Sequence, residues 1–331
     1  MTKIRKMDCL RSALEGVALL HNSSESRLIL GGRDGLDLLH RLSTNDLLSK
    51  PLTALTATTL TNEKGRIIDA LRVVRYGSGH LLLGSADAEE EVLRWIEKYT
   101  IADDVAVRSI TAETAMFALI GPRSLEAAKS LPSASEIGNG SWSTSVSGVT
   151  CFVFPDVTSL LHRVYFLVPV SQGPAFQEMI ARLGVCALGH EEWNILRTLF
   201  GIPSMPGEVS LRFTPYDVGL EHTISTTKGC YIGQEVLARL DTYHKTRRTM
   251  IGIDCAADNP PGAGDVVYQN ENEVGVVTSI AATGVNGHAY GLAVVRKEAA
   301  SGGTDLNTKD GAKFIASSFP IALPEGGAIQ Q

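Results

Sequence analysis

The chain has 331 residues, of which 44% are hydrophobic and 20% charged, a balance typical of a globular protein with a hydrophobic core and not of a disordered or fibrous chain. Its 30 basic and 36 acidic residues give a formal net charge of −6, and no basic tail is present, which argues against direct binding of nucleic acid. The length exceeds the roughly 100–200 residues of one domain and predicts two or three domains.

The first part of the chain predicts a mixed α/β region. A helix carries apolar residues at 36, 38, 39 and 42, and Asp34 stands at its N-cap position. A second helix is expected over 86–99. Strands are expected at 26–30, 53–61, 66–76 and 80–84. A short glycine-containing loop joins the last two strands, which predicts that they pair antiparallel.

Residues 132–148 are rich in Ser and Gly and predict a loop. Beyond it, helices are expected at 173–183, 189–199 and 234–240, and strands at 150–154 and 163–170. From residue 247 onward short strands alternate with Gly, Pro and Asn, at 249–255, 265–268, 274–280 and 289–295. This spacing is typical of a small antiparallel barrel.

Several classes of site and location are not indicated. No segment approaches the ~20 consecutive apolar residues of a membrane span, and the charged residues 1–8 are not followed by an apolar signal core. We therefore expect a cytoplasmic protein that does not bind membranes. His190-Glu191 begins like a metalloprotease helix, but Asn194 occupies the position of the second ligand, so no metal site is expected. Five irregularly spaced cysteines without a C-x-x-C indicate neither a zinc knuckle nor a disulfide scaffold.

The densest group of candidate functional residues is Thr227–Arg239. Cys230 lies between two glycines and shortly before the helix expected at 234–240. The helix dipole and the neighbouring Lys228 would both favour a thiolate at Cys230. The alternative interpretation is a buried cysteine that acts as a small hydrophobe.

Residues 228–235 read K-G-C-Y-I-G-Q-E, which resembles the K-G-C-[YF]-x-G-Q-E signature of the folate-binding YgfZ family, a relative of the T-protein (aminomethyltransferase) of the glycine cleavage system. Further segments resemble both groups, so that the resemblance extends from about residue 30 to 300. These segments are L-S-T-N-D at 42–46, T-N-E-K-G-R-I-I-D at 61–69, and the runs 196–203 and 215–221.

The resemblance implies an α+β, T-protein-like (GcvT-like) fold, with two α/β lobes of mostly antiparallel sheets and a small C-terminal β-barrel. The lobes would cover residues 1–140 and 141–245, the second with the signature, and the barrel residues 246–331. It also implies tetrahydrofolate or a derivative as cofactor, and a role in iron–sulfur cluster assembly or repair, including the enzymes that modify tRNA. Lys228 and Cys230 are the positions most closely tied to that role.

The chain departs from the T-protein pattern at one acidic position. T-proteins commonly carry paired acidic residues after the glycine turn, whereas here the pair reads Asp69-Ala70. Aminomethyl transfer needs a carboxylate beside the folate nitrogen, and a shift by one strand residue turns a side chain to the opposite face. T-proteins also generally lack the cysteine signature. Both departures favour an accessory protein over an aminomethyltransferase, in which Asp69 would be the catalytic carboxylate.

A folate ligand suggests further contact residues. A pterin ring prefers an acidic group at its edge and a flat or apolar neighbour. Arg197 interrupts an apolar helix and would contact either the ligand or an internal carboxylate. A cluster of basic residues that includes Arg239 would receive the polyanionic glutamate tail, unless it is a solvated surface. The candidate cofactor-binding residues are Asn45, Glu191, Glu192, Arg197, Tyr231, Gln234 and Arg239. Asn45 is alternatively a turn residue, and the two glutamates a solvated helix face.

Three functions follow, in order of preference. The first is a folate-binding accessory protein with Cys230 as a functional thiol and iron–sulfur proteins or their assembly factors as partners. The second is a folate-dependent aminomethyltransferase of one-carbon metabolism. The third is a non-catalytic binding or scaffold protein with a structural Cys230. We expect a monomer, because no heptad pattern or long apolar edge is present.

Overall fold

The computed structural model describes residues 3–49, 52, 54–131, 140–146, 148–156, 160–243, 245–285 and 287–321. Its contacts divide the chain into two units. Unit 1 combines Met1–Glu63, Ile68–Gly189 and Thr223–Gln234, and unit 2 combines Lys64–Ile67, His190–His222 and Glu235–Gln331. Among the described helices, none is long and apolar enough to span a membrane.

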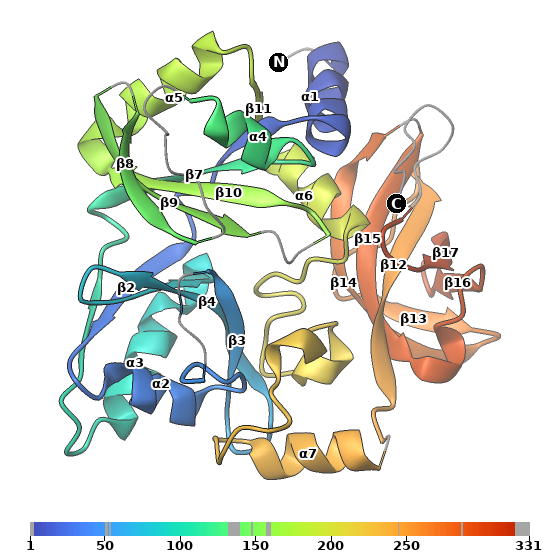
Figure 1. Cartoon of the computed structure of the whole chain (residues 1–331). Coiled ribbons are helices and arrows are strands. Elements are labelled where there is room, and N and C mark those ends of the chain that lie inside the picture. The colour runs from blue at the N-terminus through green and yellow to red at the C-terminus, as the bar shows by residue number, and fades with distance from the viewer. Residues whose placement is uncertain are drawn as a thin grey trace. The chain divides into compact units, whose positions relative to one another are not determined.

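Unit 1 contains a five-stranded sheet in the order β3-β4-β5-β2-β6. Its strands are β2 (Ser26–Gly31), β3 (Thr56–Thr61), β4 (Ile67–Tyr76), β5 (Gly79–Gly84) and β6 (Ala106–Ser109). Strands β4 and β5 pair antiparallel across their short turn, as the sequence predicts. Helices α2 (Gly35–Leu42) and α3 (Glu89–Tyr99), the latter after the 3₁₀ turn Ala86–Ala88, lie together on one side of this sheet (Figure 1).

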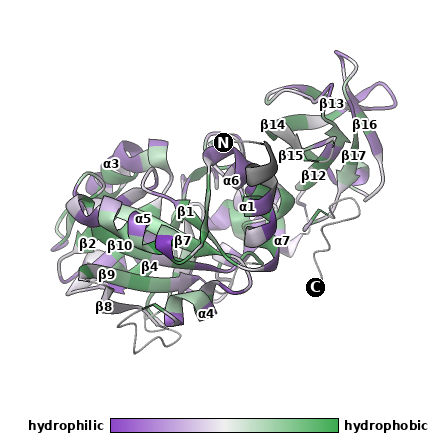
Figure 2. Cartoon of the chain, turned by 90° about the horizontal axis from the view of Figure 1, so that it is seen from above, coloured by the Kyte–Doolittle hydropathy of each residue, from purple (hydrophilic) through white to green (hydrophobic). Residues whose placement is uncertain are grey.

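A six-stranded sheet, in the order β11-β1-β7-β10-β9-β8, completes unit 1. Its strands are β1 (Ala18–His21), β7 (Thr114–Ile120), β8 (Trp142–Val146), β9 (Val149–Asp156), β10 (Arg163–Pro169) and β11 (Cys186–Leu188). Helices α1 (Lys3–Glu15), α4 (Ser124–Lys129) and α5 (Gly173–Arg182) pack beside it. Nearly every residue of the central strands β7 and β10 is buried, in agreement with their mainly apolar sequences, which Figure 2 colours as hydrophobic.

In the sequence, the strands of the five-stranded sheet are inserted between two strands of the six-stranded sheet. Strand β1 and strand β7 belong to the six-stranded sheet, whereas the segment between them forms the five-stranded sheet. Only the parallel pair β1–β11 departs from antiparallel pairing within the six-stranded sheet as described. Both sheets therefore depend on pairing between strands far apart in sequence.

Unit 2 consists of α6 (His190–Leu199), α7 (Gln234–Thr242), short 3₁₀ turns and a closed barrel in the order β12-β15-β14-β13-β16-β17. The barrel strands are β12 (Arg248–Ala256), β13 (Val266–Gln269), β14 (Asn272–Val285), β15 (His288–Arg296), β16 (Asp305–Thr308) and β17 (Lys313–Ser317). Small and β-branched residues fill its interior, among them Val267, Val277, Ala293 and Val295. The predicted C-terminal barrel is confirmed.

One sequence prediction is wrong. Residues 142–146, expected in a loop, form strand β8, because their main chain pairs with β9 although the sequence shows no apolar alternation. The cysteine spacing, which indicates no disulfide scaffold, also gave no sign of the one disulfide among the described residues, between Cys9 of α1 and Cys186 of β11. Their separation of 177 residues hides this pair from any spacing pattern, whereas folding brings their Cα atoms to 5.3 Å.

Candidate functional site

The signature residues lie in a segment of unit 1, residues 223–234, here called the signature strap. Its main chain is held at both ends by the region after α2 and by β3. The amide of Ser225 donates to the carbonyl of Thr44 at 2.9 Å, and the hydroxyl of Thr61 donates to the carbonyl of Ile232 at 2.7 Å. The strap therefore lies against main-chain groups some 180 residues earlier in the sequence.

Three buried threonines fasten the beginning of the strap. The Thr44 hydroxyl donates to the carbonyl of Thr223 at 2.6 Å, and the hydroxyls of Thr59 and Thr223 are 2.7 Å apart. The amide of Thr59 in turn donates to the Thr44 hydroxyl at 3.0 Å. All three side chains are almost completely buried, so these hydrogen bonds satisfy groups that are costly to leave unpaired.

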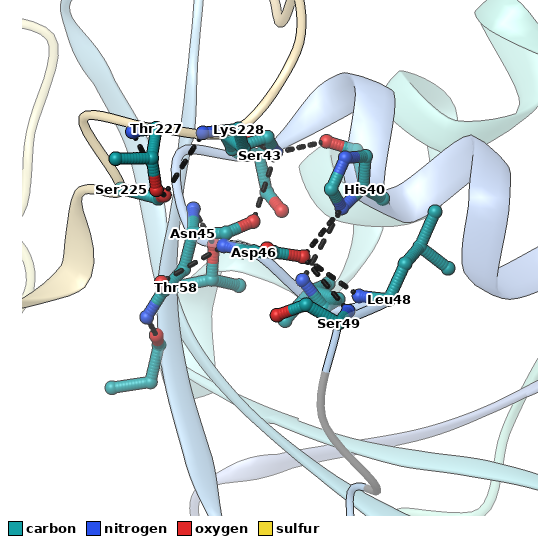
Figure 3. A network of polar contacts seen from close by, with 12 residues as sticks. His40, Ser43, Asn45, Asp46, Leu48, Ser49, Thr58, Ser225, Thr227 and Lys228 are labelled. Atoms are coloured by element: carbon teal, nitrogen blue, oxygen red, sulfur yellow. Dashed lines mark hydrogen bonds and ion pairs between the residues drawn. The ribbon is translucent and has the colours of Figure 1, made fainter.

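Lys228 lies at the centre of the network drawn in Figure 3. Its residue is 8% exposed, and its ammonium donates to the carbonyl oxygens of His40, Ser43 (2.7 Å) and Asn45 (2.8 Å). An ammonium has three N–H donors, so all of them are used within the protein. The carbonyls of His40 and Ser43 belong to the last turn and C-cap of α2, where a helix leaves acceptors without partners.

Burial lowers the pKa of Lys228 to about 8, against the attraction of the Asp46 carboxylate. Hydrogen bonds from Ser49 and Leu48 lower the pKa of Asp46 itself to about 2, so it carries a full negative charge near neutral pH. His40 lies next to both groups. Burial and the Lys228 charge lower the pKa of His40, whose Nδ1 accepts from the amide of Leu47 at 3.2 Å. Near neutral pH, Lys228 and Asp46 are therefore the charged groups of this network.

Asn45 functions as a turn residue in the structure. Its side-chain amide donates to the carbonyl of Ala57 at 2.7 Å, and its side-chain oxygen accepts from the amide of Asp46 at 2.8 Å. Its main-chain carbonyl accepts from Lys228. Of the two interpretations that the sequence left open, the turn is the one these contacts display, and a ligand contact stays a prediction.

Cys230 is exposed, whereas the other two cysteines outside the disulfide, Cys151 and Cys255, are buried. Burial raises the pKa of the Cys255 thiol to about 11, which leaves it protonated and unreactive. Cys230 is thus not the buried small hydrophobe of the alternative interpretation. Helix α7 begins at Gln234, four positions after Cys230.

Asp69 lies in β4 and is completely buried. Its carboxylate accepts from the Ser85 hydroxyl (2.7 Å), the Ser85 amide (3.0 Å) and the Ala70 amide (2.9 Å). Burial raises the pKa of Asp69 to about 6 despite these donors. A methyl group placed on Gly84 would come within 2.5 Å of the carboxylate, which shows how closely the β5 main chain covers it. Asp69 fastens the ends of β4 and β5 together.

Ala70 lies on the opposite face of β4. Two positions further on, Arg72 shares this face and contacts Glu25 and the hydroxyl of Tyr165, a residue of β10 in the other sheet of unit 1. The face of β4 that is turned to the six-stranded sheet therefore carries Ala70. The carboxylate of the adjacent Asp69 lies on the other face.

Arg197, in α6 of unit 2, is engaged in an internal ion pair. Its Nη1 lies 3.5 Å from the carboxylate of Glu208, and its Nε donates to the side chain of Asn194 at 2.8 Å. Glu208 is completely buried and also accepts from Ser279 and from the amide of Ser204. On the same helix Glu192 is buried and Glu191 exposed. The solvated-face interpretation therefore does not fit Glu192.

The remaining candidates are distributed over both units. Tyr231 of the strap is buried, and its ring lies 5.1 Å from the Lys228 ammonium. Gln234, the first residue of α7, is half-buried. Arg239 is exposed on α7 in unit 2, and His244 of its basic cluster lies outside the described residues. The structure thus brings Asn45, Lys228, Cys230 and Tyr231 into one neighbourhood and places Asp69 elsewhere in unit 1.

Sequence reasoning missed the groups that complete the network. His40, Asp46 and Thr59 shape the surroundings of Lys228 and the strap, and Glu208 is the partner of Arg197. Only Asp46 had a signal, since it ends the L-S-T-N-D segment. The other three have ordinary local sequences.

Comparison with known proteins agrees with this architecture. The GCVT N-terminal domain family matches residues 8–154. A chloroplastic protein of Arabidopsis thaliana, provisionally named a transferase, is 30% identical over 313 residues, 92% of this chain and 71% of that protein. The tRNA-modifying protein YgfZ of Colwellia psychrerythraea is 24% identical over 216 residues, 63% of each chain. An aminomethyltransferase of Geobacillus kaustophilus is 26% identical over 312 residues, 90% of this chain and 85% of that enzyme.

The fold also has a solved counterpart. The glycine cleavage system aminomethyltransferase T of Bartonella henselae superposes with a TM-score of 0.79 at 20% identity, covering 96% of this chain and 89% of that one. The mixed α/β architecture with mostly antiparallel sheets and a closed six-stranded barrel is therefore a GcvT fold. The chain belongs to the folate-binding GcvT family, which includes the aminomethyltransferases and is related to YgfZ.

Proposed function

We propose that this protein binds tetrahydrofolate or a derivative and supports the assembly or repair of iron–sulfur clusters, including those of tRNA-modifying enzymes, with Cys230 as its functional thiol. The observation that carries the proposal is the exposure of Cys230 within a strap whose neighbouring residues Lys228 and Tyr231 are buried. An exposed thiol on a well-held segment is available to a partner protein. The relative named as a tRNA-modifying YgfZ supports the link to tRNA modification.

The surroundings of Asp69 favour this function over aminomethyl transfer. The carboxylate is buried and occupied by the hydroxyl and amide of Ser85, and Ala70 stands on the face directed at the other sheet. A general base must come within about 3 Å of the proton that it removes, or act through one water. A covered carboxylate meets this requirement poorly.

The folate contacts are part of the proposal. The candidates whose side chains suit a pterin or a glutamate tail are Tyr231, Gln234, Glu191, Glu192 and Arg239. Glu192 is the candidate for the pterin edge, because a carboxylate accepts charge-assisted hydrogen bonds from ring N–H groups. Arg197 is a weaker candidate, since Glu208 already pairs with its guanidinium.

Titration calorimetry with tetrahydrofolate and its 5-formyl form tests the ligand. We expect micromolar binding that Glu192→Gln weakens about tenfold, the usual cost of one charge-assisted hydrogen bond. Glu178→Gln, at an exposed glutamate of α5, is the matched control and should bind normally. Failure of both folates to bind would remove the ligand from the proposal.

The role of the thiol is tested in cells that depend on this protein for an iron–sulfur enzyme. Cys230→Ala should abolish the activity of that enzyme while the purified variant still folds and binds folate. Retained cellular function would instead favour the non-catalytic scaffold.

Four further expectations stay predictions: iron–sulfur proteins as clients, a monomeric state, the absence of direct nucleic-acid binding and a cytoplasmic location. One relative is chloroplastic.

A folate-dependent aminomethyltransferase is the second candidate. It is favoured by relatives of that name that align over most of the chain, such as the Geobacillus kaustophilus enzyme. It requires turnover with an aminomethyl or formaldehyde donor, and this turnover should disappear in Asp69→Asn. If no donor is turned over, this candidate is eliminated.

A further inference from the structure

We propose that Lys228 is a positioning residue, which closes the signature strap onto the end of α2 and thereby presents the Cys230 thiol, and that it takes no part in proton transfer. This inference rests on the proposed role of Cys230. It is carried by the three main-chain carbonyls, of His40, Ser43 and Asn45, to which the Lys228 ammonium donates.

The donor count of the ammonium limits what Lys228 can do. Each of its three N–H groups already has a carbonyl acceptor, so the closed strap leaves no donor for a ligand or for the thiol. The acceptors are groups that a helix C-terminus otherwise leaves unsatisfied, in a place where positive charge is favourable. Loss of the ammonium would leave buried carbonyls without partners, which is costly.

The strap is held on each side of the thiol. Lys228 and Tyr231 are buried, whereas Gly229 and Cys230 between them are exposed. The Tyr231 ring lies 5.1 Å from the ammonium, so one cation holds both flanks of the exposed pair. Upstream, the Ser225 hydroxyl accepts from the amide of Lys228 at 3.2 Å. The geometry is that of a short exposed loop clamped by a single side chain.

The charges around the ammonium also have partners. His40 from α2, Asp46 from the following loop and Tyr231 from the strap are the titratable groups that the structure places against Lys228. Asp46 supplies a nearby negative charge, held by main-chain amides of the same loop. The cation is therefore balanced inside its own network, and the thiol is not needed as its counter-ion.

Hydrogen exchange and thiol alkylation together test this role. The variants are Lys228→Met, which keeps the length of the side chain but removes the donors, and Lys129→Met, a control at an exposed lysine of α4. We expect Lys228→Met to speed amide exchange in peptides covering 40–49 and 223–234 by about tenfold, while the barrel strands are unchanged. The pH midpoint of iodoacetamide alkylation at Cys230 should not move, because the Asp46 carboxylate balances the charge of the ammonium within its own network.

The opposite result overturns the proposal. An upward shift of the alkylation midpoint, whether or not exchange becomes faster, would mean that Lys228 acts on the thiol through its charge. Unchanged amide exchange together with an unchanged alkylation midpoint would mean that Lys228 does not hold the signature strap. If Lys228→Met does not fold, Lys228→Gln, with two donors, takes its place and should give a smaller increase in exchange. The exchange result is independent of cellular function, so the proposed role of Cys230 can fail in the Cys230→Ala assay while the clamp stands.

Discussion

Single residues of the same type differ sharply here because their surroundings differ. Asp46, partly exposed, receives hydrogen bonds from Leu48 and Ser49, and its pKa falls to about 2. Asp69 also receives three hydrogen bonds, yet complete burial raises its pKa to about 6. The donors compensate the removal from water in the first case but not in the second. Asp69 therefore costs stability whenever it is ionised.

The pH dependence of stability should reveal this cost. Because the folded pKa of Asp69 lies above the unfolded value of 3.8, the folded state holds more protons than the unfolded state between about pH 4 and 6. The free energy of unfolding should therefore fall with rising pH in this window, by up to about 3 kcal/mol. Asp69→Asn lacks the titrating group. Urea unfolding of both proteins is measured at pH 4.5 and 7. Relative to Asp69→Asn, the free energy of unfolding of the wild type should be lower at pH 7 than at pH 4.5. A difference between the two proteins that does not change with pH would contradict the raised pKa.

At the scale of elements, one buried ion pair connects α6 with the barrel. Glu208 follows α6 in the chain, pairs with Arg197 of that helix and accepts from the hydroxyl of Ser279 in β14 at 2.7 Å. A methyl group on Gly207 would come within 2.7 Å of the β14 main chain, so the segment lies directly on the strand. The buried ion pair of Arg197 and Glu208 therefore helps to hold α6 against β14 and β15 within unit 2.

Removing the charge of Glu208 should destabilise unit 2 strongly. Glu208→Gln leaves Arg197 buried without a counter-charge, and breaking such a pair costs about 3–5 kcal/mol. The side chain of Glu208 is 0% exposed, whereas that of Glu178, in a surface pair with Arg182, is 66% exposed. Glu178→Gln is therefore the control, with an expected effect below about 0.5 kcal/mol. Equal effects of the two substitutions on the free energy of unfolding would refute the assignment.

At the largest scale of the fold, the Cys9–Cys186 disulfide joins distant parts of unit 1, because it ties the N-terminal helix to an edge strand of the six-stranded sheet. The loop it closes spans 177 residues. On the chain-entropy model such a loop contributes up to about 5 kcal/mol, although native-state effects usually reduce this value.

Thiol titration checks this bond directly. We expect one reactive thiol in the native protein, Cys230, three in the denatured unreduced protein and five after reduction, since two of the five cysteines are bonded and two are buried. Reduction should also lower the thermal midpoint, and Cys9→Ser should reproduce the shift. Five thiols in the denatured protein before reduction would show that the disulfide does not form.

Much of the fold was predictable because it depends on local patterns. Residues 66–76 and 80–84 alternate or cluster apolar side chains around a glycine turn, and they form β4 and β5. The helices expected at 173–183 and 189–199 have clear apolar faces and are present as α5 and α6. Strands β1 and β11 escaped prediction, because strands of three or four residues carry too short a pattern and form only by pairing with strands far away in the sequence, β1 with β7 and β11 and β11 with β1.

The sequence by itself determined the family and the identity of the candidate thiol, since the signature around Cys230 is a contiguous run whose residue types carry their meaning locally. The tertiary structure decided what the neighbouring groups do. Lys228, two positions before the thiol in sequence, directs its ammonium at carbonyls more than 180 residues earlier, and Arg197 pairs with the carboxylate of Glu208. Burial makes these partners obligatory, because a desolvated charge is tolerable only when it is paired or hydrogen-bonded, and only the folded chain determines which groups are within reach.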